Sequence, residues 1–220
     1  MKKTRHLAIV IIAAAIVLSI GAVSAYATLG NDATPPVTTS DVAASYAGNV
    51  AFNLNATDAE GVAYIYHRFD KGVARLYTVG TGSAAITVPT EKDTPLPIGT
   101  HAVKFWAQDV NGNVEAQHTA TFTVNPALTL RRSVSAVAAG KYFRLSGALK
   151  PVGVNKVTIQ AKKPGASAFK KLATRITGAT GAYSCRYRTS TKGTWSFRVK
   201  FTDTKTALRA LSRIVKVRVK

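Results

Sequence analysis

The stretch KGTWSFRVKF, residues 192–201, decides the fold class. Its apolar side chains alternate with polar or basic ones: Trp195, Phe197, Val199 and Phe201 are apolar. A period of two residues is that of a β-strand with one buried face. Similar stretches recur at intervals of about ten residues, with turn signals such as Asp70-Lys71-Gly72 between them. We therefore expect an all-β chain with no helix after residue 27.

Charge divides the chain into two parts that meet at Asn125-Pro126, a typical linker dipeptide. Residues 28–126 carry nine acidic and five basic side chains, a net charge of −4, whereas residues 127–220 carry one acid and 22 basic side chains, a net charge of +21. Each part shows recurring strand patterns and no stretch with helical periodicity, which predicts an antiparallel β-sandwich in each. We expect an acidic domain over 28–126 and a strongly basic domain over 127–220.

The alternation also predicts the core of each sandwich. In residues 28–126 the expected core side chains are Phe52, Leu54, Val103, Phe105, Phe122 and Val124. In residues 127–220 they are Leu145, Val157, Ile159, Tyr183, Tyr187, Trp195, Phe197 and Val217. Cys185 is the single cysteine, which excludes an intrachain disulfide, and its place between Tyr183 and Tyr187 predicts a buried, inert thiol.

Residues 1–27 have the features of an export signal. Lys2, Lys3 and Arg5 precede an apolar run from Leu7 to Ala22, and small residues follow up to Ala27. This order predicts a signal peptide, while the length of the uncharged run also fits a membrane anchor, which needs about 20 residues. We expect a protein of the cell surface or the extracellular space, either secreted or held by this segment.

Several motifs resemble those of bacterial immunoglobulin-like modules from exported surface proteins. In the first part the matching stretches are DATPPVTTSD (32–41), NATDAEGVA (55–63), GTHAVKFWAQD (99–109) and DVNGNVE (109–115). Stretches of the second part resemble another type of module. They are GKYFRLSGALKP (140–151), KVTIQAKKPG (156–165), TGAYSCRYR (180–188) and KGTWSFRVKF (192–201). The resemblance implies two immunoglobulin-like sandwiches in tandem that act as spacers, adhesive stalks or substrate-binding appendages, and it leaves the ligand open.

Oxygen-bearing side chains gather at Asp109, Asn111, Asn113 and Glu115, and such ligands suit calcium. The spacing does not fit an EF-hand, which requires Gly at its sixth position and Glu at its twelfth. A tight loop held by hydrogen bonds of Asp109 and Asn113 explains the same residues. We therefore predict no metal, and a weak site where Asp58 approaches Asp109 is the alternative.

The sequence predicts no enzymatic activity and no cofactor. His67, His101 and His118 lie in expected strands without the spacing of metal ligands. The basic part has no His and a single Asp, so it lacks the base and acid of a hydrolase triad. The acidic part lacks a Gly-x-Ser-x-Gly elbow. A stacking platform for bases, built from Tyr183, Tyr187, Trp195 and Phe197, is disfavoured because alternation sends these rings inward.

Basic side chains occupy the outward positions of the last strands. The candidate polyanion-binding residues are Arg186, Arg188, Arg198, Lys200, Lys216, Arg218 and Lys220. If their strands pair side by side, they form one continuous cationic face. The partners we expect are wall teichoic or teichuronic acids, anionic lipid headgroups or extracellular DNA, with no sequence-specific recognition of nucleic acid. Two alternatives stay open: a merely solvated surface and docking on the acidic part.

A function from another class is that of a carbohydrate-binding accessory module in a surface hydrolase system. It requires exposed, coplanar aromatic rings, and in the acidic part Tyr64, Tyr66, Tyr77 and Trp106 are the candidates.

Overall fold

The computed structural model describes residues 32–78, 84–89 and 96–220, and every regular element among them is a β-strand. The all-β prediction is therefore confirmed for this part of the chain. None of these residues belongs to a helix that is long and apolar enough to cross a membrane. The predicted signal or anchor, residues 1–27, lies outside the described residues.

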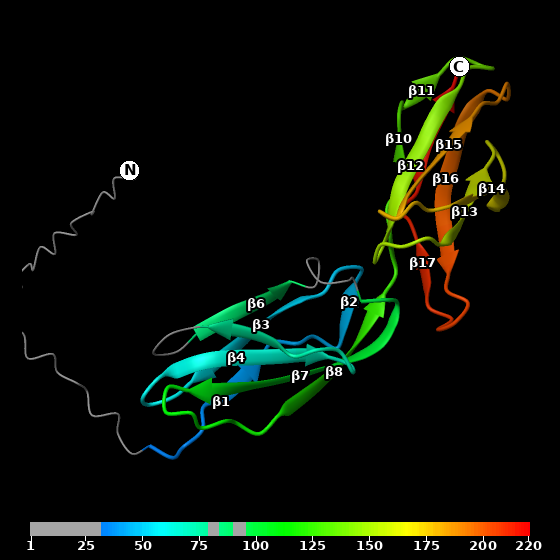
Figure 1. Cartoon of the computed structure of the whole chain (residues 1–220). Helices are drawn as coiled ribbons and strands as arrows, with labels where there is room; N and C mark the ends of the chain where they lie inside the picture. Colours follow the sequence, from blue (N-terminus) through cyan, green and yellow to red (C-terminus); the bar gives the residue numbers. More distant parts are fainter. Residues whose placement is uncertain (1–31, 79–83, 90–95) are drawn as a thin grey trace, which may run out of the picture. The chain divides into compact units, whose positions relative to one another are not determined.

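Strands between residues 37 and 125 form a pair of sheets, here called the N-terminal sheet pair (Figure 1). The strands are β1 (Val37–Ser40), β2 (Ser45–Ala47), β3 (Ala51–Thr57), β4 (Val62–Phe69), β5 (Arg75–Thr78), β6 (Ala84–Pro89), β7 (Gly99–Asp109) and β8 (His118–Asn125). One sheet has the order β1-β3-β6 and the other the order β2-β8-β7-β4-β5. The hairpin predicted at residues 70–72 is confirmed, because β4 pairs antiparallel with β5.

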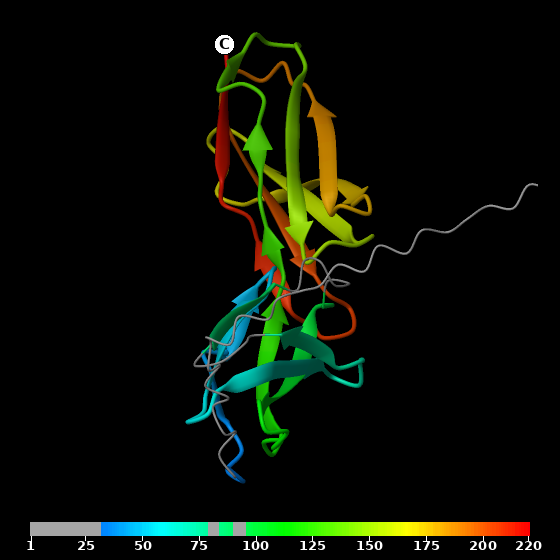
Figure 2. The ribbon, with the colours of Figure 1, turned by 60° about the vertical axis from the view of Figure 1, so that its left-hand side comes forward.

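Strands between residues 127 and 219 form the C-terminal sheet pair (Figure 1 and Figure 2). They are β9 (Ala127–Leu128), β10 (Arg131–Arg132), β11 (Ala136–Val137), β12 (Phe143–Lys150), β13 (Lys156–Lys162), β14 (Lys170–Ile176), β15 (Ala182–Tyr187), β16 (Gly193–Thr202), β17 (Arg209–Leu211) and β18 (Val215–Val219). One sheet has the order β10-β12-β15, with β9 also on β12, and the other the order β11-β18-β16-β13-β14, with β17 on β16.

Both sheet pairs repeat one connectivity despite their different sequences. In each, an early strand joins the smaller sheet and the next one crosses to the larger sheet, where it runs parallel to the last strand: β2 along β8, and β11 along β18. The remaining pairings are antiparallel, as in an immunoglobulin-type sandwich. Two different sequences in this chain therefore fold into the same arrangement of two packed sheets.

Each sheet pair has its own hydrophobic core, and the predicted core residues fill it. Phe52, Leu54, Val103, Phe105, Phe122 and Val124 are buried in the first core, and Leu145, Val157, Ile159, Tyr183, Trp195, Phe197 and Val217 in the second. Cys185 is buried as predicted. Tyr187 differs, because it is only half buried at the end of the edge strand β15, where its ring packs edge-on against Trp195 with centroids 5.7 Å apart.

Candidate polyanion-binding faces

The seven candidate cations all leave the core, but the structure divides them between two sheets. Arg186 lies on β15 and Arg188 directly follows it, in the smaller sheet of the C-terminal pair. The others lie on or directly after β16 and β18 of the larger sheet: Arg198, Lys200, Lys216, Arg218 and Lys220. The two sheets share one core, so their outer faces point in opposite directions. The condition for one continuous cationic face is therefore met only in part, because β16 pairs with β18 whereas β15 pairs with β12.

The smaller sheet carries an arginine face, which we define as Arg131, Arg144, Arg186, Arg188 and Tyr142. All four arginines are exposed, and Tyr142 is 52% exposed. Arg144 and Arg186 are direct cross-strand partners. The guanidinium carbons of Arg186 and Arg188 lie 4.7 and 5.1 Å from the centre of the Tyr142 ring, within the range of cation–π attraction.

Three members of the arginine face were missed by the sequence analysis. Arg144 alternates with Phe143 and Leu145, so its outward direction was available from the period of β12. Arg131 lies on a strand of only two residues, where no period can be read. Tyr142 directly precedes β12 in the same phase as Arg144, so the period of β12 extended by one residue also indicates its outward direction.

A shallow hollow of about 710 Å³ adjoins the arginine face. Its lining includes small side chains, hydroxyl groups and one cation: Gly147, Ala148, Ala182, Thr129, Ser146, Ser184 and Arg131. Ser146 is the direct partner of both Ser184 and Arg131 in the sheet. Gly147 is required here, because a Cβ atom on it would lie 2.0 Å from the carbonyl oxygen of Thr129.

The outer face of the larger sheet, here called the opposite face, carries Arg198, Lys200, Lys216 and Arg218. Its arginine Arg198 is already engaged within the protein: Nε donates to Oε1 of Gln160 over 2.8 Å, and the guanidinium lies 4.2 Å from the centre of the Phe169 ring. These contacts leave Arg198 half buried, whereas Lys200, Lys216 and Arg218 are exposed. The opposite face thus has one cation–π cluster, in which Lys162 joins Arg198 over the half-buried Phe169 ring at 5.7 Å, and its exposed cations lie apart from that cluster.

Little negative charge balances these cations. Asp203, the single acid after residue 126, lies between β16 and β17 and accepts hydrogen bonds from Thr206 Oγ1 and from the backbone N–H groups of Lys205 and Thr206. Those bonds, led by the Thr206 hydroxyl, lower the pKa of its carboxyl group. In residues 127–220 no Lys or Arg forms a salt bridge with a carboxylate.

An acidic cluster lies at the β7–β8 turn of the N-terminal sheet pair. Carboxylate oxygens of Asp32, Asp58 and Asp109 all lie within 4.8 Å of one another. The predicted approach of Asp58 to Asp109 is thus present, and Asp32 joins them. The predicted loop bonds are confirmed too: Asp109 accepts the backbone N–H groups of Asn111 and Asn113 at 2.9 and 2.7 Å, and the side-chain amide of Asn113 at 2.7 Å.

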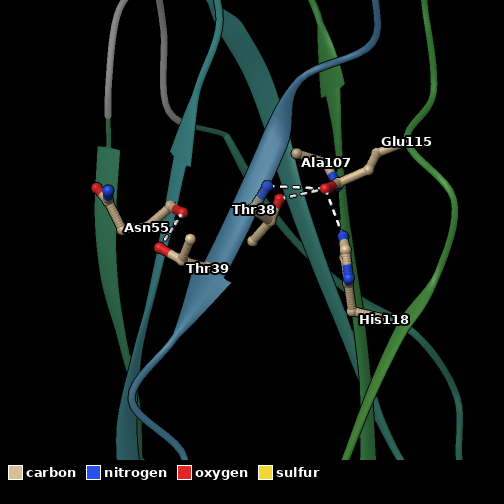
Figure 3. A network of polar contacts seen from close by, with 6 residues as sticks. All are labelled: Thr38, Thr39, Asn55, Ala107, Glu115 and His118. Carbon is tan, nitrogen blue, oxygen red and sulfur yellow. Dashed lines mark hydrogen bonds and ion pairs between the residues drawn. The ribbon is translucent and has the colours of Figure 1, made fainter.

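Glu115 belongs to a separate buried network and not to this cluster (Figure 3). Its Oε1 accepts the backbone N–H of Thr38 at 2.7 Å and lies 2.6 Å from Nε2 of His118. Its Oε2 accepts the Thr38 hydroxyl at 2.5 Å and the backbone N–H of Ala107 at 3.1 Å. The carboxylate therefore ties β1 of one sheet to β7 of the other.

The three histidines of the N-terminal sheet pair do not gather into a site. His118 contacts Glu115, whereas His101 is buried, with Nδ1 2.8 Å from Asp70 and Nε2 2.9 Å from the carbonyl oxygen of Pro97. His67 is fully buried and stacks on Tyr77, with ring centroids 5.5 Å apart. His101 is therefore a packed residue held by hydrogen bonds.

Three of the candidate carbohydrate-binding aromatics share the outer face of the five-stranded sheet. Tyr66 is the direct partner of Trp106, and their rings stack in parallel with centroids 5.2 Å apart. Tyr64 contacts Tyr66 at 6.2 Å. All three rings are half buried, so they form a small cluster whose members partly cover one another instead of an open flat platform.

Comparisons with known proteins identify no family. No family model matches the chain, and no curated protein matches it. Dimeric latent PorU from Porphyromonas gingivalis aligns with 86% of this chain at 12% identity and a TM-score of 0.38, and this chain spans only 20% of that one. The fibronectin(III)-like modules of Clostridium thermocellum CbhA align at 14% identity and a TM-score of 0.31, covering 83% of this chain and 93% of that chain.

The D0-D1 domain of intimin aligns at 15% identity and a TM-score of 0.31, covering 82% of this chain and 97% of that chain. Because each of these TM-scores lies below 0.5, we infer nothing about function from them.

Proposed function

We propose that this chain is a non-enzymatic binding or spacer protein of the cell envelope. In this proposal the two sheet pairs are tandem immunoglobulin-like domains of two sequence types, 28–126 and 127–220. The basic second domain contacts anionic polymers of the envelope or a membrane surface. The apolar N-terminal segment supports a place outside the cell, either secreted or anchored.

The observation that carries this proposal is the unbalanced charge of the C-terminal sheet pair. Its two outer faces hold exposed cations, and none of them forms a salt bridge with a carboxylate in residues 127–220. Arg144 and Arg186 even lie directly opposite each other, an arrangement that destabilises a sheet. A polyanion would relieve this repulsion and release its condensed counterions on binding.

Salt titration tests the proposal. Residues 28–220 are titrated against purified wall teichoic acid, phosphatidylglycerol vesicles and duplex DNA. We expect binding at about 50 mM salt that weakens steeply as salt rises, with a log–log slope for DNA of about −0.9 per phosphate neutralised. Replacing all seven candidate cations by Gln is expected to abolish binding while the protein stays folded, because these side chains leave the core. If the protein binds none of the three probes at low salt, the proposal is refuted.

A second candidate function is carbohydrate binding by the N-terminal sheet pair, and its site would be the half-buried cluster of Tyr64, Tyr66 and Trp106 on one outer face. This function predicts affinity for a neutral polysaccharide that changes little with salt and is lost in Trp106→Ala. Polyanion binding predicts that Trp106→Ala leaves the salt-dependent affinity unchanged, so the two candidates are distinguished by one variant.

A further inference from the structure

We propose that the arginine face and the adjoining hollow form one binding strip for a flexible polymer of phosphodiester-linked units, and that the opposite face has no part in it. This inference rests on the proposed function and narrows it to one face and one ligand chemistry. The strip is built by β10, β12 and β15, neighbouring strands of the smaller sheet (Figure 2). Their register places its groups in successive rows across that sheet.

The rows alternate in chemistry along the strands. Arg131, Ser146 and Ser184 occupy one row, and Arg144 with Arg186 occupy the next, two residues further along. Residues two apart on a strand are about 7 Å apart, and neighbouring strands are about 5 Å apart. A polymer that lies along β15 therefore first meets the row of Ser146, Ser184 and Arg131, and next the row of Arg144 and Arg186.

Arginine is suited to phosphate because its planar guanidinium donates two parallel hydrogen bonds to two phosphate oxygens. Tyr142 orients two of these groups, since Arg186 and Arg188 lie over its ring at 4.7 and 5.1 Å. A side chain that is already held in position loses less conformational freedom when it binds. Tyr142 is thus a positioning residue, and the arginines are the groups that contact phosphate.

The hollow explains why the ligand is a polymer with uncharged units between its phosphates. The hollow has a volume of about 710 Å³, and its lining combines small and apolar residues with the hydroxyl groups of Thr129, Ser146 and Ser184: the former are Gly147, Ala148, Ala182, Ile176 and Tyr183. Such a surface accepts a polyol or sugar unit through hydrogen bonds. A bilayer presents a plane of headgroups, and a plane makes no use of a hollow, so the geometry favours a chain over a membrane.

The opposite face differs in the donors that it leaves open. Its Arg198 and Lys162 also lie over an aromatic ring, that of Phe169, but Nε of Arg198 already donates to Gln160 and the side chain is half buried, so its guanidinium does not offer an open fork to a phosphate. Its remaining cations include two lysines, which act as point charges without a planar fork. Charge alone would make the two faces equal, so a comparison between them tests the strip directly.

The experiment uses residues 28–220 and compares two variants with the same net charge. The first removes three cations of the strip by Arg144→Gln, Arg186→Gln and Arg188→Gln. The matched control removes three from the opposite face by Lys200→Gln, Lys216→Gln and Arg218→Gln. The probe is purified poly(glycerol phosphate), and thermal unfolding is followed for every variant to show that it is folded.

We expect the strip variant to bind poly(glycerol phosphate) at least about tenfold more weakly and to lose about one unit of salt slope for each arginine that contacted phosphate. The control is expected to keep its salt slope. Equal losses in both variants would overturn the strip while leaving the proposed function intact. No binding of poly(glycerol phosphate) by the unaltered protein at about 50 mM salt would overturn the strip, and the proposed function falls with it only if phosphatidylglycerol vesicles and duplex DNA are not bound either.

Three further variants leave the arginines themselves unchanged. Ser184→Tyr fills the hollow without changing charge and is expected to weaken polymer binding. Tyr142→Ala is expected to weaken binding and Tyr142→Phe to restore it, because phenylalanine keeps the cation–π contact. Tighter binding of phosphatidylglycerol vesicles that is unaffected by Ser184→Tyr would favour a membrane and overturn the strip. Equal affinity for polygalacturonate, a carboxylate polymer, would overturn the phosphate assignment.

Discussion

Glu115 is the residue whose replacement tests the fold of the N-terminal sheet pair most directly (Figure 3). Its carboxylate is 9% exposed and accepts the backbone N–H groups of Thr38 and Ala107 and the Thr38 hydroxyl. The perturbation is Glu115→Gln, which keeps the shape of the side chain and exchanges one acceptor oxygen for an NH₂ donor. Whichever way the new amide turns, its NH₂ group faces a buried backbone N–H.

The expected loss follows from this geometry. One buried backbone N–H, of Thr38 or of Ala107, loses its acceptor, which costs about 1–3 kcal/mol. The remaining bonds change from charged to neutral acceptors, which weakens each by about 1 kcal/mol. With two bonds remaining on the other oxygen, we expect Glu115→Gln to lower the free energy of unfolding of the N-terminal sheet pair by about 3–5 kcal/mol. The exposed Glu60 provides the control, since Glu60→Gln is expected to change stability by about 0.5 kcal/mol or less.

Urea denaturation followed by tryptophan fluorescence measures this loss. A Trp195→Phe background leaves Trp106 to report on the N-terminal sheet pair, and Trp106→Phe leaves Trp195 to report on the C-terminal pair. With an m value of about 2 kcal/mol per molar, the midpoint seen by Trp106 is expected to fall by about 1.5–2.5 M. A shift no larger than that of Glu60→Gln would refute the role of the network. A matching shift at Trp195 would contradict two independently folding domains.

Three further outcomes are expected. Arg144→Gln is expected to raise the thermal stability of the unliganded protein by about 0.2–1 kcal/mol at low salt, because it ends the like-charge pairing with Arg186. Calorimetry should show this gain at low salt and no gain at about 1 M salt, where the charges are screened within about 3 Å. The backbone N–H and the amide of Asn53 lower the pKa of the Asp41 carboxyl below its ordinary value of 3.8. The ionised Asp41 carboxylate therefore stabilises the folded protein fully above pH 3.8, and this contribution is lost as pH falls through the lowered pKa. Chemical denaturation at pH 7 and at about pH 2 should show Asp41→Ala to be destabilising only at the higher pH, and an equal loss at both would contradict this. Ala207 has a φ of 58°, so Ala207→Gly is expected to stabilise the chain by about 0.5–1 kcal/mol in urea titrations, and a lower midpoint would count against strain at this turn.

The fold class and most core residues were predictable because they depend on a local period. In β16 the apolar positions Trp195, Phe197 and Val199 are set by alternation alone, and the structure buries all three. Tyr187 obeys the same period but lies at the end of an edge strand. How far a side chain is covered there depends on the neighbouring strands, which the period of β15 does not describe.

The binding face was not predictable from the period, because alternation tells whether a side chain points outward but not which sheet carries its strand. Arg186 and Arg198 have the same local pattern and lie on opposite outer faces, since β15 pairs with β12 and β16 pairs with β13 and β18. Strand pairing joins segments distant in the chain, and its register follows from packing two sheets on one core. Outward charge is thus a local property of this chain, whereas the meeting of Arg144, Arg186 and Tyr142 on one face is a product of its tertiary structure.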